Sequence, residues 1–174
     1  SAAPMFAEWG TRFTAQYHAT TVKYQEVNAT EGVKQVESGA ADFAETDIPL
    51  GKEELAKRGL AQFPYMLTAI TPIVNLPGVA DGQLKLNGKT LGDIFLGKIT
   101  KWNDPAISAM NPNLGLPNQA ILVAHRTADG SGTFTLRSYL TKVSPDWQAK
   151  MGASLDWPVG TAVENVYAMG DYVK

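Results

Sequence analysis

The sequence contains no cysteine, which excludes disulfide bonds, thiolate nucleophiles and cysteine-ligated metal or iron–sulfur centres. It also contains no apolar run that approaches the ~20 residues needed to cross a bilayer. The amino-terminal segment lacks the basic-then-apolar pattern of a signal peptide. We therefore expect a chain that is either cytoplasmic or already processed.

An excess of charge of one sign is absent as well. The 174 residues include 15 Lys and Arg against 17 Asp and Glu, for a net charge of -2, and no basic run occurs. Such a chain has no general attraction to nucleic acid or anionic membrane, so any anion that it binds must be captured by local donors. Histidines and carboxylates do not have metal-ligand spacing, and we expect neither a metal nor a cofactor.

Apolar residues make up 44% of the chain, and their spacing predicts helices that alternate with strands, which is typical of an α/β fold. A β–α–β unit is expected near the amino terminus, and the apolar run 65–76, interrupted by Pro72, is expected to cross between two lobes. Residues 1–65 would then belong to the first lobe and residues 66–174 to the second. Helices are predicted at 4–18, 31–38 and 52–58, from Thr90 to Gly97, and after Asp104 and Ser144; strands are predicted at 22–27, 41–45 and 84–86.

The segment 121–133 carries the strongest functional signal. An apolar run ends at Arg126, and a glycine-bearing turn then opens directly into an amphipathic helical pattern. Free N–H groups at a helix start attract anions, Gly132 allows close approach to the backbone, and Ser131 and Thr133 add hydroxyl donors. Arg126 supplies a forked, permanently charged donor, so the pattern predicts an oxyanion site, although such turns also occur on ordinary surfaces.

Two carboxylates could complete this site. Asp47 follows the predicted strand 41–45, where it is either a loop cap or an acceptor for the proton of a phosphate, which sulfate lacks at neutral pH. Asp129 lies three residues beyond Arg126 and could hold its guanidinium, or form a surface ion pair of little energetic value.

A hydrolase remains an alternative in which Ser131 is the nucleophile. The order strand, Gly-Ser-Gly, helix differs from the Gly-x-Ser-x-Gly elbow, and a base would have to come from His18 or His125. His125 is better interpreted as a structural histidine, because alternation along a strand turns it away from Arg126. We therefore expect a binding protein and not an enzyme.

With these residues in hand, the chain resembles the periplasmic phosphate-binding proteins of bacterial phosphate ABC transporters over nearly all of its length. The motifs that carry the resemblance are AEW at 7–9, GVKQ at 32–35, DFAETDIPL at 42–50, QFP at 62–64, VNLPG at 74–78, LGDIFLGKI at 91–99, KWND at 101–104, ADGSGT at 128–133 and WPVG at 157–160. The resemblance implies a periplasmic-binding-protein-like fold of two α/β lobes with mixed sheets that close on one phosphate at a hinge.

The resemblance also implies residue roles and partners. Asp47 would accept the phosphate proton, Arg126 would donate to an oxygen, and Ser131, Gly132 and Thr133 would supply backbone and hydroxyl donors. Inorganic phosphate would be the ligand, and a membrane ABC permease would receive it in the periplasm.

Several positions depart from the family pattern. Ala29 stands where the family has a serine donor, so Thr30 would take its place, and Ser1 would be a remnant of the first binding loop. The spacing between Arg126 and the turn is shifted by one residue. The chain ends at Lys174, before the family's remaining segment, which predicts a truncated fold that needs that segment or a second chain. The alternative is a sensor or binding domain for another oxyanion, favoured if Glu31 blocks the pocket.

Overall fold

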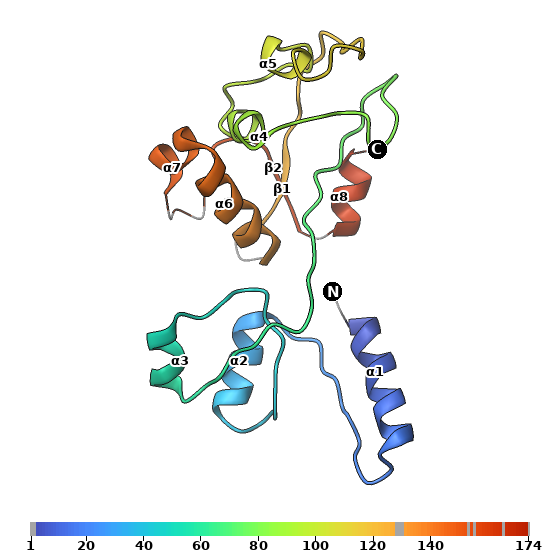
Figure 1. Cartoon of the computed structure of the whole chain (residues 1–174), viewed down its shortest axis with the longest axis vertical. Coiled ribbons are helices and arrows are strands. Elements are labelled where there is room, and N and C mark those ends of the chain that lie inside the picture. The colour runs from blue at the N-terminus through green and yellow to red at the C-terminus, as the bar shows by residue number, and fades with distance from the viewer. Residues whose placement is uncertain (1–2, 128–130, 153, 155, 165, 174) are drawn as a thin grey trace. The chain divides into compact units, whose positions relative to one another are not determined.

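The computed structural model describes residues 3–127, 131–152, 154, 156–164 and 166–173; for residues 131, 166 and 167 it describes the backbone alone. The chain divides into two compact units, Ser1–Gln62 and Phe63–Lys174, and each is described by itself (Figure 1). The assignment of residues 1–65 and 66–174 to two lobes of a binding protein stays a prediction.

The first unit contains helices α1 (Ala3–Gln16), α2 (Ala29–Glu37) and α3 (Lys52–Arg58). Helix α3 has the predicted bounds, and it ends because Gly59 takes the left-handed conformation, with φ of 67°. Helix α2 begins two residues earlier than predicted, since the side chain of Asn28 accepts a hydrogen bond from the Glu31 amide at 2.9 Å and caps the helix.

The predicted strands 22–27 and 41–45 do not form in the described part of this unit, so the expected β–α–β unit is wrong in its strands. The two segments nevertheless pack against the helix that lies between them in the sequence, because a Cβ placed on Gly32 of α2 would lie 3.2 Å from Ala44 and 3.8 Å from Val27. Helix α2 thus covers both extended segments. Apolar alternation makes a segment extended, but a strand also requires a ladder partner, and none is paired with either segment among the described residues.

The second unit is built around a parallel pair of strands, β1 (Ala124–Arg126) and β2 (Thr161–Val163), with Arg126 opposite Val163. Helices α6 (Ser131–Val143) and α8 (Val166–Val173) both contact β1, and Figure 1 shows them on opposite sides of the strand pair. Helices α4 (Gly88–Phe95), α5 (Pro105–Ser108) and α7 (Pro145–Met151) complete the unit.

Local helix signals in this unit are confirmed where a cap is present. Asp104 and Ser144 cap α5 and α7, and each helix has proline in its first turn as predicted. Helix α4 begins before the predicted Thr90, because Asn87 is its cap and accepts from the Thr90 amide at 2.8 Å. The predicted strand 84–86 is not formed, and no strand is assigned within 65–76.

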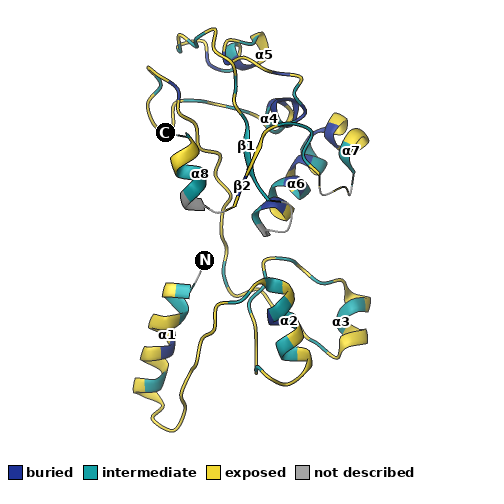
Figure 2. Ribbon diagram, turned by 180° about the vertical axis from the view of Figure 1, so that it is seen from behind, coloured by how far each residue is buried: buried dark blue, intermediate teal, exposed yellow. Residues whose placement is uncertain are grey.

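The core of the second unit consists of two clusters. One contains Leu76, Ile94, Ile99, Trp102 and Ile107, and the other contains Leu96, Leu140 and Trp147. Figure 2 shows the buried residues gathered in this unit, whereas the helices of the first unit carry mainly exposed and intermediate residues. Helix α4 approaches the start of α7 so closely that a Cβ on Gly92 would lie 2.7 Å from Ser144 Oγ.

Candidate functional site

Arg126 lies at the carboxyl end of β1, the position at which open α/β sheets bind ligands. Its Nη2 donates to the Glu164 carbonyl at 3.2 Å, since the parallel register brings the residue after Val163 beside it. Its Nε is buried and has no hydrogen-bond partner in the described structure. One donor thus anchors the partly buried guanidinium, and Nε is a second donor that no described residue satisfies.

Helix α6 begins at Ser131 and places Gly132 and Thr133 in its first turn, where backbone N–H groups have no helical acceptor. The Thr133 side chain is buried, and its Oγ1 donates to the Thr127 carbonyl at 3.0 Å. That hydroxyl therefore closes the turn between β1 and α6. The donor that Thr133 leaves for a ligand is its backbone amide.

Three predicted site residues meet on one cavity. Arg126, Gly132 and Thr133 all line a cavity of about 860 Å³ within the second unit. A Cβ on Gly132 would lie 3.7 Å from Ile70 Cδ1, which places the helix start beside the extended segment 69–75. The cavity thus has polar donors at one end, supplied by Arg126 and the start of α6, and apolar walls elsewhere. The apolar walls include Ile73, Leu86, Leu91, Ile94, Phe95, Ile121, Leu136 and Val173.

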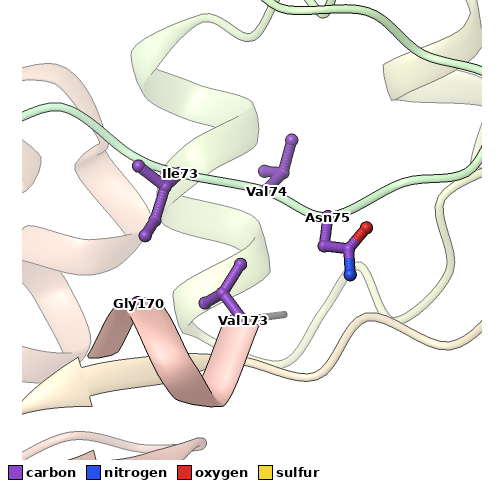
Figure 3. Close-up of a pocket in the computed structure, with 5 residues that line it drawn as sticks. All are labelled: Ile73, Val74, Asn75, Gly170 and Val173. Atoms are coloured by element: carbon purple, nitrogen blue, oxygen red, sulfur yellow. The ribbon is translucent and has the colours of Figure 1, made fainter. Parts of the chain in front are cut away.

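A neighbouring pocket of about 380 Å³ continues this apolar surface. Ile73, Val74 and Asn75 line it from the extended segment, and Gly170 and Val173 line it from α8. Figure 3 shows the side chains of Ile73 and Val173 facing the same space. None of its lining residues is ionisable, so this pocket does not suit an anion.

The other predicted site residues lie in the first unit or outside the described residues. Thr30 is exposed in the first turn of α2, and Asp47 is exposed in the loop that follows residues 41–45. Ser1 and Asp129 are not among the described residues, and neither is the side chain of Ser131. The predicted pairing of Asp129 with Arg126 therefore stays a prediction.

The loop around Asp47 is held by residues that the sequence analysis did not single out. Thr46 Oγ1 accepts from the Ile48 amide at 3.1 Å, and the Gln62 side chain accepts from the Leu50 amide at 3.0 Å. The Asp47 carboxylate makes no hydrogen bond with any described residue. The Thr46 hydroxyl caps this loop by accepting from the Ile48 amide, so the alternative of Asp47 as a loop cap is wrong.

Glu31, the carboxylate proposed to block a pocket, is directed along its own helix. Its Oε1 accepts from Gln35 Nε2 at 3.4 Å, one turn further on. This contact gives no support to the alternative in which Glu31 fills a binding site.

Comparison with known proteins identifies the family. A family profile described as a PBP superfamily domain matches residues 1–174. The chain belongs to the PBP superfamily. The phosphate-binding protein PstS of Xylella fastidiosa strain Temecula1 is 41% identical over 98% of this chain and 47% of its own length. The proteins of the same name from Haemophilus influenzae and Methanocaldococcus jannaschii are 41% and 32% identical, over 52% and 44% of their lengths.

These relatives confirm the resemblance to phosphate-binding proteins and the periplasmic-binding-protein-like fold. This PBP-superfamily chain spans about half the length of the curated relatives that it matches. Within its described residues, no helix is both long and apolar enough to cross a membrane. No group of three His, Asp or Glu that could hold a metal ion is found in the same part of the chain.

His125 has the environment expected of a structural histidine in this PBP-superfamily chain. Its ring stacks on Trp157, with centroids 4.9 Å apart and planes inclined by 18°, and its Nδ1 lies 2.9 Å from the Arg126 carbonyl. The ring of His125 and its Nδ1 therefore both make contacts that hold β1 in place.

Proposed function

We propose that this chain is the phosphate-binding part of the solute-binding component of a phosphate ABC transporter. The observation that carries the proposal is the meeting of Arg126 with the first-turn amides of α6 on one cavity. This arrangement joins a guanidinium to a helix dipole, and both favour an oxyanion. The relatives named for phosphate binding support the choice of phosphate among oxyanions.

Binding involves no covalent change in this proposal. Arg126 and the backbone amides of Gly132 and Thr133 donate to phosphate oxygens, and Ser131 and Thr30 supply hydroxyl donors. Asp47 accepts the phosphate proton, with its carboxylate free for that purpose among the described residues. Sulfate has no proton to offer at neutral pH and would face the carboxylate with like charge. Ser1 and Asp129 are assigned roles as a remnant binding residue and a partner for Arg126.

The cellular setting forms part of the same proposal. The protein works in the periplasm, captures inorganic phosphate and delivers it to a membrane permease. Residues 1–65 and 66–174 contribute to two lobes, and segment 65–76 acts as their hinge.

The cavity of about 860 Å³ in the second unit has mainly apolar walls, and we propose that a further segment covers it. Leu67 and Leu122 are 97% and 79% exposed, and Ile73 of the extended segment is 54% exposed. The relatives are about twice as long as the region that they share with this chain, so we assign the cover to the remaining half of a family-length protein. Mixing the chain with that half of the Haemophilus influenzae relative, followed by light scattering, should give a 1:1 complex; a homodimer of the chain alone would instead assign the cover to a second copy.

Isothermal titration calorimetry with phosphate, arsenate and sulfate tests the binding proposal. Phosphate and arsenate, which both carry a proton at neutral pH, should bind, and sulfate should not. The titration is repeated with the 1:1 complex. Absence of phosphate binding in both forms would overturn the proposal, and a preference for sulfate would favour a binding domain for another oxyanion.

A further inference from the structure

Arg137 is a buried cation in the middle of α6. Its side chain is 5% exposed, and its guanidinium carbon lies 5.6 Å from the ring centre of Trp147 and 5.4 Å from that of Trp157. The two indoles also contact each other, with ring centres 5.7 Å apart, so both rings lie on one side of the guanidinium and each is within cation–π distance of it. Trp147 is itself fully buried at the start of α7.

Carboxylates do not neutralise Arg137 in the described structure. Its Nη1 donates to the main-chain carbonyl of Asp156, while the Asp156 carboxylate accepts from Ser154. Its Nη2 is buried without a hydrogen-bond partner among the described residues. Burial lowers the pKa of Arg137 and the charge of Asp156 opposes that change, but a guanidinium retains its charge at neutral pH. A charge kept at this cost, with aromatic faces as its main partners, calls for a role other than simple packing.

The stack continues from Arg137 to the strand that carries the proposed anion donor. Trp157 holds Arg137 near its ring and also stacks on His125 of β1 at 4.9 Å. His125 Nδ1 in turn contacts the carbonyl of Arg126 at 2.9 Å. We call the four side chains Trp147, Arg137, Trp157 and His125 the aromatic–arginine stack.

The aromatic–arginine stack links two elements that carry separate parts of the proposed site. His125 is the neighbour of Arg126 in β1, and Arg137 lies in the same helix whose first turn contains Gly132 and Thr133. The distance from the Arg126 guanidinium to the free amides of α6 therefore depends on how β1 is held against α6. A planar guanidinium that packs against two mutually contacting indoles and also donates to the Asp156 carbonyl fixes that relation more rigidly than an aliphatic contact, because its orientation is defined as well as its distance.

We propose that Arg137 is a positioning residue for the oxyanion site, acting through Trp157 and His125 on Arg126. The inference rests on the proposed function, because the ligand that it serves is phosphate. Arg137 itself touches no ligand in this scheme. It sets the spacing between the guanidinium donor on β1 and the amide donors on α6.

The test compares Arg137→Met with Ile107→Ala in phosphate titrations, using the chain or its 1:1 complex, whichever form binds phosphate. Ile107 is fully buried in the other core cluster, so its truncation lowers the melting temperature without touching the stack. Arg137→Met should weaken phosphate binding at least tenfold, whereas Ile107→Ala, with an equal or larger loss of melting temperature, should change it less than twofold. Equal affinities for Arg137→Met and wild type, or equal losses in both variants, would overturn the positioning role.

A second readout separates this inference from the proposed function. Hydrogen exchange at the amide of Thr127, which donates to the Val163 carbonyl at 3.3 Å, should be faster in Arg137→Met than in Ile107→Ala, whether or not phosphate binds. If wild type binds no phosphate, the proposed function fails, while faster exchange at this amide still shows that Arg137 positions the end of β1. If Arg137→Met does not fold, Arg137→Lys replaces it, because lysine keeps the charge but lacks the planar group, and the same outcomes apply.

Discussion

The side chain of Asn111 pairs with the backbone of Lys85 as a neighbouring strand would. Its Oδ1 accepts from the Lys85 amide at 2.7 Å, and its Nδ2 donates to the Lys85 carbonyl at 2.8 Å. The same Nδ2 also donates to the Ile107 carbonyl at 2.9 Å. A buried side chain thus satisfies the segment that was predicted to be a strand.

Replacing Asn111 with leucine should destabilise the protein, since it leaves both backbone groups of Lys85 without a partner. We expect a loss of about 1–3 kcal/mol in the free energy of unfolding, measured by urea denaturation. Asn113→Leu is the matched control, because Asn113 is exposed nearby and should tolerate the same change. Equal stability of the two variants would contradict the assigned role.

Arg126→Ala should weaken phosphate binding by about 2–5 kcal/mol, the range for removing one member of a desolvated charge pair. The lost Glu164 contact lies at the surface, so the melting temperature should change little. Calorimetry measures the first effect and thermal denaturation the second. Arg12→Ala, at an exposed arginine of α1, should leave both unchanged.

Asp47→Asn should reduce discrimination between phosphate and sulfate. The amide can donate to an unprotonated oxyanion, whereas the carboxylate repels it. Competition of sulfate against phosphate in calorimetric titrations measures the change. Asp42→Asn, at an exposed carboxylate of the preceding segment, serves as control, and unchanged selectivity in Asp47→Asn would remove Asp47 from the proposed site.

Thr133→Val should destabilise the turn between β1 and α6, because the partly buried Thr127 carbonyl would lose its hydroxyl donor. The expected loss is about 1–3 kcal/mol of unfolding free energy. Thr133→Ser should recover most of it, and the exposed Thr135→Val should cost little. A Thr133→Val variant as stable as wild type would show that the turn does not depend on this hydrogen bond.

Stability should fall at low pH through Asp146. Lys98 Nζ lies 2.5 Å from Asp146 Oδ2 and, by this hydrogen bond and its charge, holds the pKa of Asp146 below the ordinary value of 3.8. The folded-state pKa is the lower one, so the stabilisation is complete above the unfolded-state value and is lost as pH falls through the folded value. Melting temperatures between pH 6 and pH 2 should show a smaller decline for Asp146→Asn than for wild type; parallel curves would refute the contribution.

The sequence predicted helices better than strands, and the reason is physical. Asp104, Ser144 and Gly59 determine helix ends through contacts within a few residues, so their effect is visible locally. Segments 22–27, 41–45 and 84–86 have strand-like patterns, but pairing depends on residues elsewhere. The Asn111–Lys85 pair illustrates this, since its members lie 26 positions apart.

The candidate site likewise has one part that could be predicted from the sequence and another that could not. The turn that ends in Thr133 could be predicted because strand, glycines and helix follow each other directly. The aromatic–arginine stack could not, since His125, Arg137, Trp147 and Trp157 come from separate elements with no common period. The hydroxyl of Thr133 also acts on the turn itself, which a motif alone does not reveal.

The hydrogen bond between Arg126 and the Glu164 carbonyl has a consequence for the selectivity of the proposed anion site. A long, flexible side chain normally loses rotational freedom when it grips a ligand, and that loss weakens affinity. The hydrogen bond to the Glu164 carbonyl already restricts the Arg126 side chain. In the proposed site, an anion would therefore meet a preorganised donor, and selection among anions would depend on shape and protonation with little rearrangement.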